Sequence, residues 1–584
     1  EKTMADYEIL KTINSPKDVK DLSFMALKEL CDEMRAAIIN RVSKHGGHLG
    51  PNLGVVELTT ALHYVFDSPN DKLVWDVSHQ SYPHKLLTGR AAAFYDDDHY
   101  GDASGYTAPQ ESEHDIFTVG HTSTSVSLAS GLAKARDLKG GSENVIAIIG
   151  DGSLSGGEAF EGLDNVGAFK SNFIVIVNDN EMSIAKNYGG LYGNLAKLRE
   201  TKGQAEDNYF KALGFDYVYV DEGNDVVKLI TELMKVKDSD HPVVVHVHTL
   251  KGCGYQPAVD DKESFHWTMP FDVESGKILP LPETETYADI VADYMEKRVQ
   301  KDRNLAVVTA GTPGAVNLGE FRTKHPDNYF DVGIAEEHAI AFLSGMAKAG
   351  LKPAGLFYGG FIQRTYDQLS QDLCLNNSPA VIVLESCGLT SMDATHLSVF
   401  DIPLMSNIPN LVYLAPTCKD EALRMLDWAF AQKAFPVALR MPAAAPQELE
   451  YKPQAEIELN KFEMIKKGSK IALLGLGNFL KLAEETANLL KEKGVEATII
   501  NPRFTTGLDK EMLTSLLKDH EIIVTLEDGI VNGGFGEKIA SFYGEQAVKV
   551  YNFGADKEFT DRVAMSELLE RYSLTAAQIV QKIL

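Results

Sequence analysis

The sequence is poor in cysteine and contains no long apolar run. Its five cysteines, at positions 31, 253, 374, 387 and 418, form no CxxC pair, so they indicate neither a disulfide framework nor a Cys-rich metal site. Reduced thiols of this kind are typical of the cytoplasm, which is where we expect the protein. No apolar run reaches the roughly 18 residues that a membrane span needs. The first residues, EKTMADYEILKTI, also lack the apolar core of a signal peptide.

Positive charge is scarce as well. The chain of 584 residues has 56 Lys and Arg against 83 Asp and Glu, which gives a formal net charge of −27. This balance makes nucleic acid and anionic membranes poor partners, and we expect neither. An anionic ligand would have to be met by local cations or by a metal ion. The length and the composition, 44% hydrophobic and 24% charged, indicate a globular enzyme with more than one hydrophobic core.

Residues 144–184, NVIAIIGDGSLSGGEAFEGLDNVGAFKSNFIVIVNDNEMSI, contain two apolar runs that each end at a cluster of Gly, Asp and Asn. The runs Val145–Ile149 and Phe173–Val177 show no polar alternation, as strands buried on both faces do, and an amphipathic segment separates them. The pattern predicts a βαβ unit of a parallel sheet. Because ligands of such sheets bind beyond the carboxyl ends of the strands, Asp151 and the polar residues 178–180 would share one site.

Oxygen atoms at this edge would suit a magnesium diphosphate group. Mg²⁺ prefers carboxylate, amide and backbone oxygens together with phosphate oxygens, and Gly150 and Gly152 would let the backbone approach a phosphate closely. An acidic residue at a strand end is, however, as often a solvated loop residue as a ligand. The spacing alone leaves both interpretations open.

Two stretches of weak periodicity divide the chain. Residues 271–286, FDVESGKILPLPETET, contain two prolines, and residues 441–460, MPAAAPQELEYKPQAEIELN, are rich in Pro, Ala and Gln. Each of the three parts between them alternates strand and helix patterns. We therefore expect an α/β protein with mostly parallel sheets and three consecutive domains, at residues 1–280, 281–450 and 451–584.

Several motifs together resemble the 1-deoxy-D-xylulose-5-phosphate synthase family, whose members are relatives of transketolase. The segment from GDG to NDN resembles the fingerprint of thiamine diphosphate enzymes. The narrower motifs are SKHGGHLGPNLGVVELTTALH at 43–63, WDVSHQSYPHKLLTGR at 75–90, VGHTSTSVSLASGLAKARDLKG at 119–140, KGCGYQPA at 251–258, FDVGIAEEHAIAF at 330–342 and YGGFIQRTYDQ at 358–368. The resemblance covers nearly the whole chain and implies a transketolase-like fold and a homodimer. It also implies the decarboxylative condensation of pyruvate with glyceraldehyde 3-phosphate, with thiamine diphosphate and Mg²⁺ as cofactors.

The resemblance further implies the residues of the site. Asp151 and Asn180 would bind Mg²⁺ by their side chains, and Met182 by its backbone carbonyl. Glu336 matches the catalytic glutamate, which favours the imino tautomer of the cofactor, and Phe361 matches the aromatic residue that stacks on the aminopyrimidine. The other residues expected to line the cofactor are His79, Gly120, His121, Thr122, Gly152 and Tyr255.

A second group of residues matches positions around the reactive carbon of the cofactor. Each step of the implied reaction moves a proton near neutral pH, for which imidazole is suited. Of the 16 histidines, His63, His99, His114 and His325 are expected at the surface or in packing. The matched residues are His48, His79, His266, His396, Tyr358 and Asp393.

The chain departs from the family pattern where an acceptor phosphate is expected to bind. Ser386 and Ala443 stand where the family has arginines, and the loop from Asp393 to His396 is one residue shorter. Losing two guanidiniums should weaken phosphate recognition, at about 1.5–3 kcal/mol for each charged hydrogen bond. Arg364 or Lys85 would be substitute cations.

These departures keep an alternative open, a divergent transketolase-like enzyme that transfers a two-carbon unit to a different, even unphosphorylated, acceptor. A 2-oxoacid dehydrogenase component is disfavoured by the loops around His48 and His121, and a silent binding protein by the retained Glu336. LGLGNF at 474–479 lacks the third glycine of a dinucleotide fingerprint.

Overall fold

The computed structural model describes residues 7–280 and 283–584. The chain divides into two compact units, one on each side of residue 282, and each unit is described by itself. The expected connector at 271–286 includes residues 281 and 282, which lie outside the described residues. No helix of the described residues is long and apolar enough to cross a membrane. All five cysteines are free thiols, as expected, and four of them are buried.

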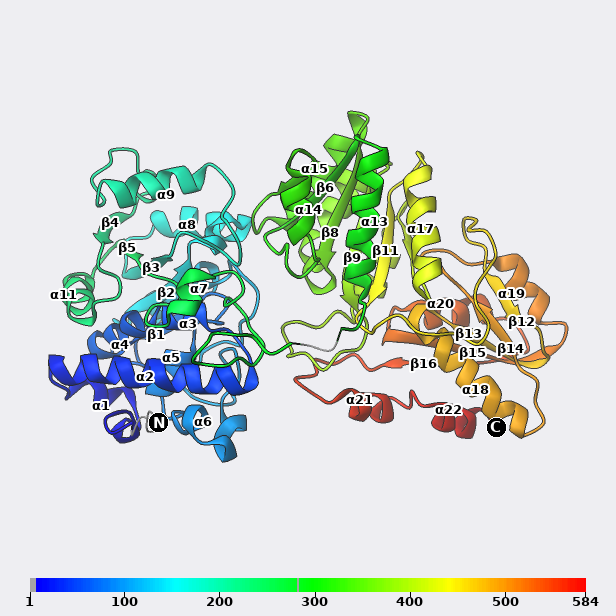
Figure 1. The fold of residues 1–584 in the computed structure, drawn as a ribbon, viewed down its shortest axis with the longest axis horizontal. Helices are drawn as coiled ribbons and strands as arrows, with labels where there is room; N and C mark the ends of the chain where they lie inside the picture. The colour runs from blue at the N-terminus through cyan, green and yellow to red at the C-terminus, as the bar shows by residue number, and fades with distance from the viewer. Residues whose placement is uncertain (1–6, 281–282) are drawn as a thin grey trace. The chain divides into compact units, whose positions relative to one another are not determined.

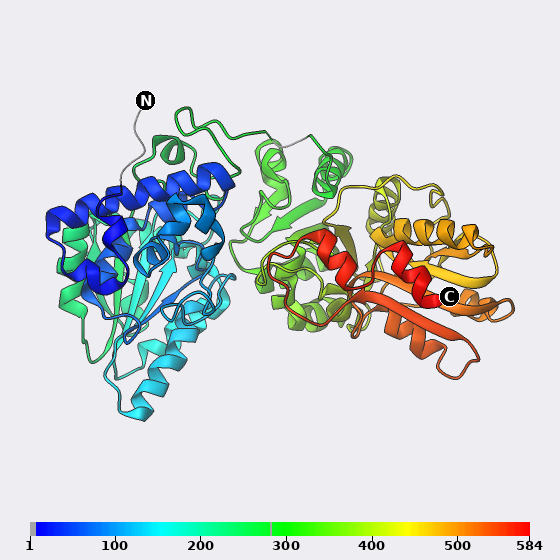
Figure 2. The same cartoon turned by 90° about the horizontal axis from the view of Figure 1, so that it is seen from below.

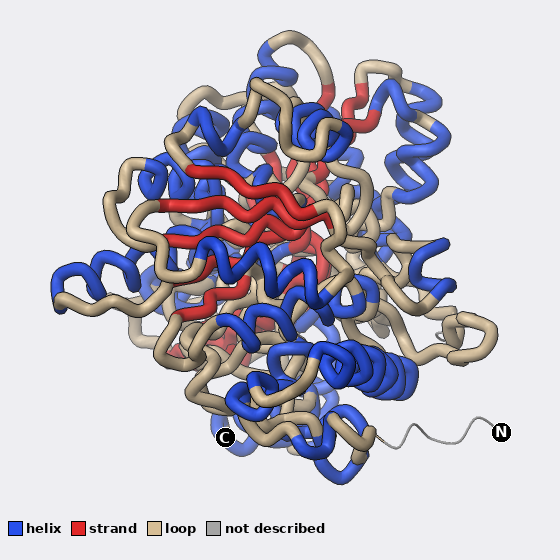
Figure 3. Tube along the Cα trace, turned by 90° about the vertical axis from the view of Figure 1, so that its left-hand side faces the viewer, coloured by secondary structure: helices blue, strands red, loops and turns tan. Residues whose placement is uncertain are grey.

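The first unit is built on a five-stranded parallel sheet, whose strands lie side by side with helices around them (Figures 1 and 3). Alternate residues of the second strand enter two different cores: Ile146 and Ile148 face one, and Ala147 and Ile149 face the other. The strand is thus buried on both faces, as its unbroken apolar run predicts. In spatial order the strands are β1 (Lys72–Trp75), β2 (Val145–Gly150), β3 (Phe173–Asp179), β5 (Pro242–His248) and β4 (Asp216–Val220).

Helices cover both faces of this sheet. The core that contains Ile146 includes side chains of α2, α4 and α11, and the core that contains Ala147 includes side chains of α7 and α8. The helices of the first unit are α1 (Pro16–Lys20), α2 (Phe24–His45), α3 (Gly50–Leu53), α4 (Val56–Val65), α5 (Tyr82–Leu87), α6 (Ala92–Tyr95), α7 (Ser125–Lys139), α8 (Gly157–Gly167), α9 (Leu191–Glu200), α10 (Tyr209–Ala212), α11 (Val226–Val236) and α12 (Gln256–Asp260).

The second unit contains two further sheets. The first of them has six parallel strands, and the other has five strands of which β12 is antiparallel to its neighbour β14. The six-stranded sheet runs β10 (Val412–Leu414), β11 (Val437–Pro442), β9 (Val381–Cys387), β8 (Lys352–Tyr358), β6 (Leu305–Thr309) and β7 (Tyr329–Asp331). The five-stranded sheet runs β12 (Glu463–Lys466), β14 (Thr498–Asn501), β13 (Lys470–Gly475), β15 (His520–Ile530) and β16 (Lys549–Ala555).

Helices pack on both sheets of the second unit. The C-terminal helix α22 packs against α18, and this end of the chain is red in Figure 2. The helices are α13 (Tyr287–Lys301), α14 (Gly319–Lys324), α15 (Glu336–Lys348), α16 (Asp401–Ser406), α17 (Lys419–Ala431), α18 (Leu480–Glu492), α19 (Lys510–Leu516), α20 (Phe535–Phe542), α21 (Met565–Arg571) and α22 (Ala576–Ile583), with a 3₁₀ helix η5 (Gly359–Thr365) after β8.

The prediction of α/β architecture with mostly parallel sheets is confirmed by these three sheets. One sheet falls in each of the three residue ranges that the sequence suggests, although the last two ranges share one compact unit. The exact domain bounds stay a prediction.

Candidate functional site

The ends of β2 and β3 bring the predicted metal ligands to one edge of the first sheet. The two strands are parallel neighbours, with Gly150 opposite Asn178, so the residues that follow them lie beside each other. Asp151 donates its backbone N–H to the Asn178 carbonyl at 3.0 Å. Asp151 and Asn180 are both buried. The expectation that both strand ends contribute to one site is therefore met by the register of the sheet.

Three oxygen-bearing groups converge at this edge. Turned one way, the Asn180 amide nitrogen donates to the Met182 carbonyl oxygen at 2.7 Å and to Asp151 Oδ1 at 3.3 Å. Turned the other way, the amide oxygen faces the same two oxygens with no hydrogen between them. Magnesium binds amide, backbone and carboxylate oxygens, and these three groups supply one of each, so the residues fit the metal. Within residues 7–280 and 283–584, no group of three or more His, Cys, Asp or Glu could hold a metal ion, so this mixed set is the candidate.

Asp179, between the predicted ligands, holds the turn from Asn178 to Met182. One of its carboxylate oxygens accepts from the Glu181 backbone N–H at 3.1 Å, and the other lies 2.7 Å from both Arg199 and His246. Burial raises the pKa of Asp179, but these two partners outweigh it and hold the pKa below its usual range. The turn is thus fixed by a buried ion-pair network, which the sequence patterns do not reveal.

Lys251 places a buried amine near Asp151. Its ammonium group donates to the Ser183 carbonyl at 2.7 Å, and the side chain is 1% exposed. Burial lowers the pKa of Lys251 to about 7, while the Asp151 charge acts in the opposite direction. Burial and the neighbouring Asp179 raise the pKa of Asp151 well above its usual range. Lys251 opens the KGCGYQPA motif, but the motif itself does not indicate a role for this residue.

The loop of Gly120, His121 and Thr122 is held by Asp76. The Asp76 carboxylate accepts from the Ser123 N–H at 2.8 Å and from the Ser125 N–H at 3.0 Å, at the start of α7. The backbone is left-handed at Val77, Ser78 and Ser123, with φ values of 57°, 67° and 74°. Such φ values are costly for residues other than glycine, above all for a β-branched valine, and they concentrate at functional sites. Asp76 was not singled out from the sequence, because its contacts are with residues 47 and 49 positions away.

Three of the predicted catalytic histidines lie together. The ring centroid of His48 is 5.1 Å from that of His79 and 5.4 Å from that of His266, and the His79 and His266 centroids are 5.4 Å apart. Nδ1 of His266 is buried without a hydrogen-bond partner among the described residues. Desolvation and the nearby Lys251 lower the pKa of His266 well below its usual range, so its imidazole is neutral at pH 7. His266 therefore joins the cluster as a neutral imidazole.

Two predicted cofactor residues make close contacts with protein groups. A Cβ on Gly152 would lie 2.7 Å from the Ser183 Cβ, so the close approach of Ser183 requires glycine at this position. A Cβ on Gly150 would meet nothing within 4 Å, which leaves that position open to a ligand. Tyr255 packs against Phe265 and Phe271 and donates its hydroxyl hydrogen to the Val273 carbonyl at 2.9 Å.

In the second unit, Glu336 is the first residue of α15 and is buried. Its Oε2 has no hydrogen-bond partner among the described residues, and Arg364 of η5 lies 3.9 Å away. Burial raises the pKa of Glu336 to about 7, and the Arg364 charge opposes that shift. A buried carboxyl oxygen with no partner suits a group that hydrogen-bonds to a ligand.

The other predicted residues of the second unit gather at the ends of β8 and β9. The Phe361 ring centroid is 5.0 Å from Tyr358 and 5.8 Å from His396. Tyr358 donates its hydroxyl hydrogen to the His396 carbonyl at 2.6 Å, and His396 Nδ1 lies 3.2 Å from Asp393 Oδ2. Burial raises the pKa of Asp393, but His396 outweighs it and lowers the pKa to about 2. These four residues, from two segments of the chain, thus form one cluster.

The proposed substitute cations are both engaged. Lys85 is fully buried and donates to Glu111 at 2.9 Å, to Ser104 and to the Tyr106 carbonyl, while Arg364 lies beside Glu336. Lys85 is therefore surrounded by hydrogen-bond acceptors, and it could replace a missing arginine only by breaking these hydrogen bonds. Ser386 has a left-handed backbone with φ 60°, and Ala443 is exposed.

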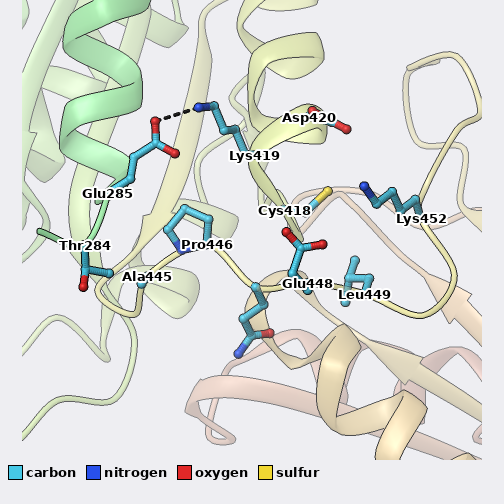
Figure 4. Close-up of a pocket in the computed structure, with 11 residues that line it drawn as sticks. Thr284, Glu285, Cys418, Lys419, Asp420, Ala445, Pro446, Glu448, Leu449 and Lys452 are labelled. Carbon is cyan, nitrogen blue, oxygen red and sulfur yellow. Dashed lines mark hydrogen bonds and ion pairs between the residues drawn. The ribbon is translucent and has the colours of Figure 1, made fainter.

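A hollow of about 300 Å³ lies elsewhere on the second unit (Figure 4). Lys419, at the start of α17, forms an ion pair of 2.6 Å with Glu285 beside it. None of the predicted site residues lines this hollow, so it does not belong to the candidate site. Its lining residues are Thr284, Glu285, Cys418, Lys419, Asp420, Ala445, Pro446, Gln447, Glu448, Leu449 and Lys452.

Comparison with known proteins shows the family to which the chain is related. Residues 10–206 and 199–249 match the family model described as 1-deoxy-D-xylulose-5-phosphate synthase, residues 283–447 the transketolase pyrimidine binding domain, and residues 460–579 the transketolase C-terminal domain. Together with the parallel sheets, these matches define a thiamine diphosphate-dependent enzyme of the transferase type.

The curated relatives narrow the class. The chain is 39% identical to 1-deoxy-D-xylulose-5-phosphate synthase of Pelotomaculum thermopropionicum, over 99% of this chain and 96% of the relative, and 39% identical to that of Symbiobacterium thermophilum, over 98% and 94%. The chain therefore belongs to the 1-deoxy-D-xylulose-5-phosphate synthase family. Among solved structures, it is similar to transketolase from Campylobacter jejuni, with 18% identity over 96% of this chain and 100% of the other and a TM-score of 0.45.

Proposed function

We propose that this protein condenses pyruvate with glyceraldehyde 3-phosphate, with loss of CO₂, to give 1-deoxy-D-xylulose 5-phosphate. Thiamine diphosphate and Mg²⁺ are the cofactors. The observation that carries the proposal is the set of converging oxygens from Asp151, Asn180 and Met182 in a chain that matches this family over 99% of its length.

Residues of the first unit would hold the charged end of the cofactor. Asp151, Asn180 and Met182 supply oxygens to the metal, and Gly150 leaves space for a phosphate. Lys251, with a pKa of about 7, is about half protonated at pH 7 and adds partial positive charge at the same edge in a chain whose net charge is −27. Neutral His266 is suited to hydrogen-bond the substrates, and the neighbouring imidazoles of His48 and His79 are of the residue type that transfers protons near neutral pH.

Residues of the second unit would serve the reacting end. Thiamine diphosphate supplies the carbanion chemistry when bound. With a pKa of about 7, Glu336 can hold or release a proton at Oε2 near neutral pH. Phe361 offers an aromatic face, and Asp393 orients the His396 imidazole through Nδ1.

The proposal is tested by the product. Purified protein with Mg²⁺, thiamine diphosphate, pyruvate and glyceraldehyde 3-phosphate should form 1-deoxy-D-xylulose 5-phosphate, identified by NMR, and chelation of Mg²⁺ should stop the reaction until the metal is restored. Unphosphorylated glyceraldehyde serves as the matched acceptor. If it reacts as well as the phosphate ester, or if no phosphorylated ketose appears, the proposed acceptor is wrong.

We also propose that the protein works as a homodimer in the cytoplasm. The family resemblance and the five free thiols support this assignment. Sedimentation of the purified protein would test the oligomeric state, and a monomer at working concentration would contradict it.

A further inference from the structure

The loop at 388–398, which carries Asp393 and His396, rests on the last domain of the second unit. Gly388 donates its N–H to the Ser398 carbonyl at 2.9 Å and so closes the base of the loop. Gly388 has φ 102°, and a Cβ there would clash with the carboxylate of Asp528. Leu389 and Leu397 are buried in the same core as Phe553 of β16 and Leu568 of α21. The base of the loop is therefore seated on a rigid surface.

The tip of the same loop is held by residues near the C-terminus. The Arg562 backbone N–H donates to the Met392 carbonyl at 2.9 Å, and the Ala394 backbone N–H donates to Asp561 Oδ1 at 3.1 Å. These two hydrogen bonds flank Asp393 on both sides. The contacts join positions 167 and 170 residues apart, so they are tertiary rather than local.

The C-terminal segment, residues 556–562, is itself fixed in place. Arg562 has a left-handed backbone, with φ 52°, and its side chain donates to the other Asp561 oxygen at 2.8 Å. Phe559 packs edge-on against Phe400 with a centroid distance of 5.7 Å. Glu558 accepts from the Tyr572 hydroxyl at 2.5 Å, which ties the segment to the end of α21. A segment fixed by several contacts can transmit its position to the loop that it touches.

We propose that Asp561 is a positioning residue for the reaction. Its carboxylate, together with the Arg562 N–H, fixes the backbone on both sides of Asp393 and thereby holds Asp393 against His396, 3.2 Å from Nδ1. The Asp561 side chain is about half exposed and meets the loop by way of the Ala394 backbone, so it acts through Asp393 rather than on the substrate. The inference rests on the proposed function, in which Asp393 and His396 serve the reacting carbon.

Three variants separate the hydrogen bond from the negative charge. Asp561→Ala removes the acceptor and should lower kcat by about 10- to 100-fold, with little change in the KM for pyruvate. A displacement of about 1 Å in a catalytic group can cause a loss of this size. Asp561→Asn keeps the accepting oxygen and should retain kcat within about threefold. Asp556→Ala, an exposed change in the same segment, should leave kcat unchanged. Equal losses in the Ala and Asn variants would overturn the role of the hydrogen bond.

A double-mutant cycle and hydrogen exchange complete the test. If Asp561 acts through Asp393, Asp561→Ala should cost less than about twofold in an Asp393→Ala background, whereas multiplied losses would overturn the proposal. Amide exchange at 388–398 should be faster in Asp561→Ala and unchanged in Asp561→Asn. Unchanged exchange in the Ala variant would also overturn it. Amide exchange can be measured without turnover. If the wild type forms no product, so that the proposed function is wrong, the exchange rates still show whether Asp561 holds the loop.

Discussion

Burial sets the chemistry of Glu336. The side chain begins α15 inside the second unit, where desolvation raises its pKa from 4.5 to about 7. Between those two pH values the native state binds more protons than the unfolded chain, so the free energy of unfolding falls as the pH rises through this window. Glu336→Gln should remove about 3 kcal/mol of that fall, measured by urea unfolding of cofactor-free protein at the two ends of the window. Part of the slope should remain, because Glu385 and Glu527 also have pKa values raised to about 8. An unchanged slope in the variant would contradict a raised pKa at Glu336.

At the scale of elements, the turn after β3 depends on the strands and the helix beside it. Asp179 ends β3 and binds His246 of β5 and Arg199 of α9, so one carboxylate joins three elements. Asp179→Ala would leave Arg199 paired with the more exposed Glu181 carboxylate, 3.3 Å away, and it should reduce the free energy of unfolding by about 3 kcal/mol, the lower end of the range for breaking a buried pair. Asp207→Ala removes an exposed ion pair with Lys197 and should cost less than about 1 kcal/mol. Equal effects in the two variants would show that the buried network does not stabilise the turn.

The elements also show what the sequence can and cannot predict. The strand ends at Asp151 and Asn180 could be predicted, because unbroken apolar runs mark buried strands and parallel strands end at a common edge. The oxygen set and the histidine cluster followed from motifs in separate loops. Asp76 and Asp561 could not be predicted, because each acts on the backbone of a distant segment, and the left-handed φ values around them leave no periodic pattern. Lys251 was missed since burial, rather than sequence spacing, gives it its low pKa.

At the scale of the whole molecule, the predicted site residues are divided between the two compact units. The first unit carries the candidate metal ligands and the histidine cluster, and the second carries Glu336, Phe361 and the Asp393–His396 pair. In a chain with a net charge of −27, the partly protonated Lys251 and a divalent metal would counter the charge of an anionic cofactor. Each unit has its own hydrophobic cores, so a change at Glu336 should leave the candidate metal ligands intact.

The most direct test of the account is release of CO₂ from pyruvate in the presence of glyceraldehyde 3-phosphate, Mg²⁺ and thiamine diphosphate, compared between the wild type and Glu336→Gln. Cofactor binding to both proteins is followed separately by calorimetric titration. The account predicts that the wild type releases CO₂ in step with ketose formation, while Glu336→Gln binds Mg²⁺ and cofactor yet loses turnover by at least about 100-fold, the lower range for removal of a group that works by proton transfer. Turnover retained in Glu336→Gln, or a wild type that binds the cofactor and releases no CO₂, would contradict it.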